Sequence, residues 1–161
     1  TSGQICPRSS DHVNATSQLG LLLQNRAQSF QLFVVRSTVP GNRFQRLQLL
    51  QKTGVKVGIL TTEDRQLNRR RAKKLGLDFD FHGVKDKLQI VKDLCEKANI
   101  NLAEVAYIGD DVNCFELLSH VGIAVCPSNA VEKVKLIPNI IQLERNGGEG
   151  VVREFVEIIL S

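Results

Sequence analysis

The sequence predicts an α/β fold in which a parallel β-sheet is covered by helices on both faces. Short apolar segments alternate with amphipathic segments from residue 54 to residue 160. Polar residues follow three of the apolar segments directly. The chain has 161 residues, of which 42% are apolar and 24% are charged. That length and composition support one packed core and leave no room for a large second domain.

The expected elements follow from apolar periodicity and from the breakers between them. In chain order we expect strand 30–35, helix 44–52, strand 55–60, helix 63–75, strand 79–81, helix 85–98, strand 105–108, helix 114–120, strand 123–125, helix 130–136, strand 140–143 and helix 151–160. Pro40 closes the first strand, Gly54 precedes the second, and Gly76 is a typical C-terminal stop for the second helix. Pro127 opens a turn, and the glycine-rich segment 147–150 precedes the last helix. The helix over 85–98 has apolar residues at helical spacing (Leu88, Val91, Leu94 and Cys95).

Several classes of protein are disfavoured by composition. No apolar run approaches the roughly 20 residues of a membrane span, and the N-terminus does not resemble a secretory signal. The four cysteines form no CxxC pair and the three histidines are scattered, which argues against a zinc site or a disulfide scaffold. We therefore expect a cytoplasmic protein with free thiols and no membrane partner.

Charge is unevenly distributed. Residues 1–62 carry seven Lys or Arg and one acid, a balance of +6, and residues 63–161 carry fourteen and sixteen, a balance of −2. A basic first half could bind nucleic acid. Its basic residues are spread out, however, and few aromatic residues accompany them (Phe30, Phe33 and Phe44). We expect no nucleic-acid partner.

Polar residues stand where three predicted strands end. These are Thr61 and Thr62, His82 and Gly83, and Asp110 and Asp111. In open α/β sheets, ligands bind at the edge formed by the carboxyl ends of the strands. We therefore expect these loops to converge, although they are far apart in the sequence.

Each of these residues has a structural and a functional explanation. Adjacent carboxylates at 110 and 111 suit Mg²⁺, but an aspartate there also caps the following helix. A threonine at the start of a helix can bind phosphate, or it can simply cap the N-terminus of that helix. Lys87 begins a helix, where the helix dipole disfavours a cation. It therefore either interacts with a nearby anion or is solvated at the surface. Together, a hydroxyl, an ammonium and paired carboxylates predict a phosphoryl-transfer site with Mg²⁺, in which the attacking group is still missing.

The stretch VGILTTEDRQLNRRRAKKLGLDFDFHGVKDKLQIVKDLCEKANINLAEVAYIGDDVNC resembles the haloacid dehalogenase superfamily. More narrowly, it is similar to the small cap-less phosphatases that act on 3-deoxy-octulosonate 8-phosphate (KDO 8-phosphate), or on KDN or N-acylneuraminate 9-phosphate. The C-terminal GGEGVVREF fits the same group. The resemblance covers about residues 50–160 and includes the phosphatase-like C-terminal domain of CMP-sialic acid synthetases. It implies a Rossmann-like fold without a large cap, Mg²⁺ as cofactor, a phosphorylated sugar acid as substrate, and a homotetramer.

The resemblance also implies roles for individual residues. Thr61 matches the threonine that binds the transferring phosphoryl group, and Lys87 the lysine that stabilises the nucleophile and the phosphate. Asp110 matches the magnesium ligand, with Asp111 and Asn113 in its outer shell. The sugar-binding positions are Thr62, Glu63, Arg71 and Lys74. The positions of a tail that approaches a neighbouring subunit's site are Gly147, Gly148, Gly150 and Arg153.

The family's first motif, DxDG, does not occur in this chain. Its first aspartate attacks phosphorus in the family, and the family spacing counted back from Gly54 leads to residues 17–19, where no carboxylate stands. Asp11 is the one acid before Glu63. Residues 1–49 are therefore an atypical segment, either unrelated sequence joined to a phosphatase core at 50–161 by a frame error or a fusion, or part of a member that lost catalysis. The alternative function is a non-catalytic oligomerisation or scaffold domain.

Overall fold

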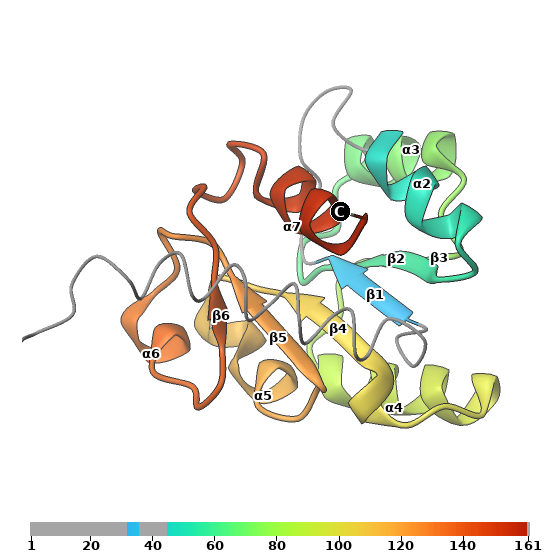
Figure 1. The fold of residues 1–161 in the computed structure, drawn as a ribbon. Coiled ribbons are helices and arrows are strands. Elements are labelled where there is room, and N and C mark those ends of the chain that lie inside the picture. Colours follow the sequence, from blue (N-terminus) through green and yellow to red (C-terminus); the bar gives the residue numbers. More distant parts are fainter. Residues whose placement is uncertain (1–31, 36–44, 161) are drawn as a thin grey trace, which may run out of the picture.

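The computed structural model of the chain describes residues 32–35 and 45–160 (Figure 1). Asp11, Pro40, the count to residues 17–19 and the irregular stretch 1–29 lie outside the described residues. Among the helices of the described part, none is both long enough and apolar enough to span a bilayer.

The described strands form one six-stranded sheet in the order β3-β2-β1-β4-β5-β6. All of its pairings are parallel. The strands are β1 (Leu32–Val35), β2 (Lys56–Leu60), β3 (Phe79–Phe81), β4 (Val105–Ile108), β5 (Ile123–Cys126) and β6 (Ile141–Gln142). The predicted parallel α/β fold is confirmed, and β1 lies at the centre of the sheet.

Helices cover both faces of this sheet (Figure 1). They are α2 (Gln45–Lys52), α3 (Gln66–Leu75), α4 (Lys87–Ala98), α5 (Phe115–Leu118), α6 (Glu132–Lys135) and α7 (Val151–Leu160), with short 3₁₀ turns η2 (Leu102–Glu104) and η3 (Val112–Cys114). Buried residues of α2, α3 and α7 join one core cluster, and those of α4, α5 and α6 join the other. The helix α2 runs across residue 49 and contributes Leu47 and Leu50 to the core.

The strands alternate between the two cores because successive side chains point to opposite faces. On β4, Ala106 and Ile108 face the α2–α7 side, whereas Val105 and Tyr107 face the α4–α6 side. All four residues of β4 are buried. This explains why the strands read as continuous apolar runs rather than as alternating patterns.

The helices α3 to α6 begin later than the periodicity predicts, and α5 and α6 also end earlier than the predicted 114–120 and 130–136. Hydrogen bonds explain the first two. The helix α3 begins at Gln66 rather than at Glu63, because the Glu63 carbonyl accepts a hydrogen bond from the Gly83 N–H and holds the segment as a loop. The helix α4 begins at Lys87, since the Asp86 carboxylate accepts the Gln89 N–H at 3.1 Å and caps it.

A close contact explains the glycine in the middle of β2. A β-carbon at Gly58 would lie 2.2 Å from the Phe79 ring on the neighbouring strand. We expect Gly58→Ala to lower the free energy of unfolding by about 1–3 kcal/mol through overpacking. Urea denaturation measures this, and a second substitution, Phe79→Ala, should make the Gly58→Ala step nearly neutral. Equal losses in both backgrounds would contradict the contact.

The described cysteines are free and buried, as predicted (Cys95, Cys114 and Cys126), and Cys6 lies outside the described residues. Burial raises the pKa of the Cys126 thiol to about 11. Since the thiolate is the reactive form, we expect native Cys126 to alkylate about 100-fold more slowly at pH 8 than an ordinary cysteine. Mass spectrometry after iodoacetamide treatment measures this rate. Urea-unfolded chain serves as the control, and equal rates in both states would refute the prediction.

Candidate active site

The register of the sheet brings Thr61 and Asp110 to the same edge. Val35 pairs with Ile59 on β2 and with Ile108 on β4. Thr61 and Asp110 each follow two residues beyond that level, on either side of β1. Neighbouring strands lie about 4.8 Å apart, so the two positions are separated by about 10 Å across the end of β1. The predicted convergence of these two strand ends is therefore present.

Thr61 is fixed by the loop that follows β3. It is 4% exposed. Its N–H donates to the Phe81 carbonyl at 3.0 Å, and its carbonyl accepts the Val84 N–H at 3.0 Å. The Thr61 Oγ1 accepts the Glu63 N–H at 3.1 Å, which leaves the hydroxyl proton as a donor. A rigid, nearly buried hydroxyl donor at a strand end can bind a phosphate oxygen.

Lys87 is buried rather than solvated. It is 3% exposed, and its Nζ lies 3.4 Å from the Tyr107 hydroxyl and 3.5 Å from the Cys114 Sγ. Tyr107 and Cys114 are also in contact, at 3.1 Å. Because they stand shortly before and after Asp110 in the sequence, the ammonium lies against the loop that carries Asp110. This burial decides against the solvated surface lysine, since a buried ammonium is costly without an anion.

The adjacent aspartates at the end of β4 have different surroundings. Asp111 caps η3, and its Oδ1 accepts the Val112 N–H at 2.7 Å. The carbonyl of Asp110 accepts the Val131 N–H at 3.0 Å, and its half-buried carboxylate lies close to Gly147. The helix cap is thus provided by Asp111, whereas Asp110 fits the ligand position. Asn113 lies exposed in η3.

The residues predicted to bind the sugar are divided between the two edges of the sheet. Thr62 and Glu63 follow Thr61 directly, and Glu63 pairs with Arg65 at 3.7 Å. Lys74 lies eight residues beyond Gln66, about 12 Å further along the helix axis. This takes it toward the opposite edge, where the Asp78 carboxylate accepts the N–H of Val57 at the start of β2.

Arg71 lies in α3, and its side chain lies outside the described part of the structure. Arg69, two residues earlier, donates hydrogen bonds to both carboxylate oxygens of Asp64, at 2.6 and 2.9 Å. These hydrogen bonds from Arg69 hold the pKa of Asp64 below its usual value. Arg69 is thus held beside Asp64, and the assignment of Arg71 and Lys74 to sugar binding stays a prediction.

His82 is a strand-end residue with one unpartnered atom. Its Nε2 lies 3.2 Å from the Asp80 carboxylate, and its side chain is 3% exposed. Its Nδ1 is buried without a hydrogen-bond partner among the described residues. The sequence placed His82 at the sheet edge, but nothing in its spacing indicated this burial.

The glycine-rich tail lies against Asp110 of its own chain. The Gly147 N–H donates to Asn129 Oδ1 at 2.8 Å. Arg153 pairs with Glu157 in the same helix at 2.8 Å, while α7 packs Phe155 fully into the core. Gly148 and Gly150 both have positive φ, which favours glycine. Sequence reasoning missed Asn129 and Glu154, whose partners are backbone groups that no spacing reveals.

One carboxylate is a sparse ligand set for a metal. Within residues 32–35 and 45–160, no three His, Cys, Asp or Glu side chains are grouped to hold an ion. Mg²⁺ accepts one or two carboxylates if waters and substrate phosphate complete its six ligands. Asp110 therefore fits Mg²⁺ as the protein's contribution to a site that a phosphate completes.

The attacking group of the family is absent from the sequence after β1. From residue 36 to residue 62 the chain contains no Asp or Glu. Two residues beyond Val35 the sequence has Ser37, which lies outside the described residues.

Several known proteins are similar to this chain in sequence and in fold. The family model of haloacid dehalogenase-like hydrolases matches residues 76–155. The chain is 34% identical over 107 residues to the KDO 8-phosphate phosphatase of Escherichia coli K12, which covers 66% of this chain. It belongs to the haloacid dehalogenase-like hydrolases. Among these hydrolases it is a relative of the KDO 8-phosphate phosphatases, and it spans 56% of the length of the E. coli protein.

Solved structures of this hydrolase family agree in fold. KDO 8-phosphate phosphatase from Moraxella catarrhalis, in complex with a magnesium ion, a phosphate ion and KDO, matches with TM-score 0.77 at 26% identity. The match covers 86% of this chain and 90% of that one. A further relative is N-acylneuraminate cytidylyltransferase B from Danio rerio, 30% identical over 119 residues, which cover 71% of this chain and 28% of that enzyme.

Proposed function

We propose that this hydrolase is a Mg²⁺-dependent phosphatase of phosphorylated 3-deoxy-ulosonate sugars, acting in the cytoplasm. The substrates we expect are KDO 8-phosphate or the 9-phosphates of KDN or N-acylneuraminate. The observation that carries the proposal is that Lys87 is buried against the Asp110 loop while Thr61 is buried at the end of β2, at the same edge of the sheet. The relation to phosphatases of this substrate class supports it.

Three residues would bind the phosphate and the metal ion. The Thr61 hydroxyl donates to one phosphate oxygen, and the Lys87 ammonium neutralises negative charge on the phosphate. Asp110 would hold the ion, which supplies electrostatic stabilisation of the phosphate when bound. Attack through an aspartyl-phosphate, which releases the sugar alcohol and is then hydrolysed by water, requires a carboxylate, and Asp11 is the only acid upstream of Glu63. The proposal therefore assigns attack to Asp11.

Phosphate release from KDO 8-phosphate and from N-acylneuraminate 9-phosphate, with and without Mg²⁺, tests this proposal. Glucose 6-phosphate serves as a control that carries no carboxylate. We expect Mg²⁺-dependent release from at least one ulosonate substrate and its loss in Asp11→Asn. Absence of release from both substrates would refute catalysis by this polypeptide.

A second candidate is a non-catalytic domain of the same fold that binds the sugar phosphate and forms a homotetramer. The specific observation that favours it is the lack of any acid from residue 36 to residue 62, directly after the central strand. It predicts binding of phosphate and Mg²⁺ without turnover. Sedimentation velocity tests the assembly, and a strictly monomeric chain would refute the tetramer.

A further inference from the structure

The glycine loop, defined here as residues 144–150, leads into α7 and passes the carboxylate of Asp110. A β-carbon at Gly147 would lie 3.6 Å from Asp110 Oδ2 and 3.5 Å from Asn129 Oδ1. These are ordinary contact distances, so an alanine would fit beside both oxygens. The backbone of Gly147 does not have a positive φ. Neither backbone strain nor a steric clash therefore explains the glycine at this position.

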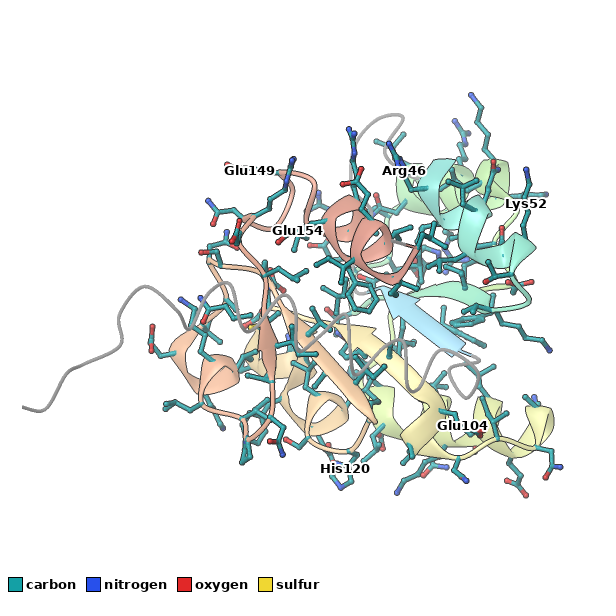
Figure 2. The ribbon with its side chains drawn as sticks, in the orientation of Figure 1. Arg46, Lys52, Glu104, His120, Glu149 and Glu154 are labelled. Carbon is teal, nitrogen blue, oxygen red and sulfur yellow. The ribbon has the colours of Figure 1, made fainter. Side chains whose placement is uncertain are left out.

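Several hydrogen bonds hold the glycine loop in place. Besides the Gly147–Asn129 hydrogen bond, the Ser128 N–H donates to the Arg145 carbonyl at 3.0 Å. The carboxylate of Glu154 on α7 accepts the N–H groups of residues 144 and 145, each at 3.0 Å. Figure 2 shows Glu154 on the side of α7 that faces this loop. The loop is therefore a built part of the site.

Asn129 connects the glycine loop to the metal-binding position. It lies in the turn after β5, two residues before Val131. The Val131 N–H holds the backbone of Asp110, and the Asn129 side chain holds the backbone of Gly147. The turn that contains Asn129 and Val131 thus fixes the position of Asp110 relative to the glycine loop. The neutral amide does this without adding a second negative charge beside Asp110.

We propose that Asn129 is a positioning residue that sets the glycine loop of the same chain as a wall of the divalent-ion site. The space that Gly147 leaves beside Asp110 Oδ2 would accommodate water ligands of an ion held by that carboxylate. Mg²⁺ retains several waters, each about 2.1 Å from the ion, and a methyl group 3.6 Å from the carboxylate oxygen would intrude on them. This inference rests on the proposed function only in that Asp110 holds the ion.

Two readouts on the full chain test the proposal: hydrogen exchange of the Gly147 amide without metal, and the Kd for Mg²⁺ by calorimetry in the presence of inorganic phosphate. Asn129→Leu removes the acceptor. We expect at least tenfold faster exchange at Gly147 and about fivefold weaker Mg²⁺ binding. Asn129→Asp retains an acceptor oxygen and should preserve the exchange protection. Gly147→Ala should preserve protection and weaken Mg²⁺ binding about tenfold, and Glu149→Gln, in the exposed part of the loop, is the surface control.

Unchanged exchange in Asn129→Leu would overturn the anchoring role. Faster exchange with unchanged Mg²⁺ affinity would overturn the link to the ion site, as would wild-type affinity in Gly147→Ala or a wild-type chain that binds no Mg²⁺. A wild-type chain that binds Mg²⁺ but releases no phosphate would refute the proposed activity, and these variants would still decide the role of Asn129.

Discussion

Asp110→Asn is expected to lower Mg²⁺ affinity by about 100-fold or more, because it removes the one carboxylate that the described site offers to the ion. Loss of an outer partner of a metal ligand costs about 10- to 100-fold, and loss of the ligand itself should reach at least the upper value. Calorimetric titration with Mg²⁺ in the presence of inorganic phosphate measures the effect. Any Mg²⁺-dependent phosphate release should disappear with it.

The neighbouring aspartate is the matched control for this substitution. Asp111→Asn retains the Oδ1 that accepts the Val112 N–H and so retains the cap of η3. We expect its Mg²⁺ affinity to fall less than tenfold. Similar losses at both positions would mean that the two carboxylates share the ion, and a larger loss at Asp111 would reverse the assignment.

Lys87→Met is expected to weaken binding of inorganic phosphate by about 100-fold and to leave the fold intact or more stable. Truncating one partner of a buried, hydrogen-bonded charge pair costs about 2–5 kcal/mol of binding free energy, and about 100-fold lies within that range. The lysine is 3% exposed, so replacing a desolvated ammonium with an apolar chain of similar length relieves a cost of burial.

Opposite signs of the two effects distinguish a functional lysine from a structural one. Phosphate titration and thermal unfolding should be measured on the same preparation. Lys85→Met, two residues earlier and exposed, is the control and should change neither quantity. A Lys87→Met chain that unfolds more easily and binds phosphate normally would make Lys87 a structural residue.

The strands were predictable because a sheet buried on both faces requires apolar runs. The runs at 79–81 and 105–108 match β3 and β4 residue for residue. The strand predicted over 30–35 is present as β1 (Leu32–Val35). The family spacing places the DxDG aspartate near residues 17–19 instead, and the sequence just after β1 carries none of the family's acidic residues.

The site was predictable where strand order alone determines position. Thr61 follows β2 and Asp110 follows β4, and both of these strands pair with β1. Parallel pairing therefore brings the two residues to one edge of the sheet. The sugar-binding role of Lys74 stays a prediction, because the sequence pattern gives the face of α3 on which a residue lies and not its distance along the helix axis from Thr61. Residue type alone did not separate the roles of Asp110 and Asp111; the family resemblance assigned the ligand to Asp110, and the hydrogen bond from the Val112 N–H shows that Asp111 is the helix cap.

The central claim is that Thr61, Lys87 and Asp110 serve one site in which phosphate and Mg²⁺ bind together. Titration of Mg²⁺ in the absence and presence of saturating inorganic phosphate tests it most directly. Because binding free energies are reciprocally linked, each ligand must strengthen the other by the same factor. We predict at least a fivefold rise in Mg²⁺ affinity with phosphate and an equal rise in phosphate affinity with Mg²⁺. Independent binding of the two ligands would contradict a shared site.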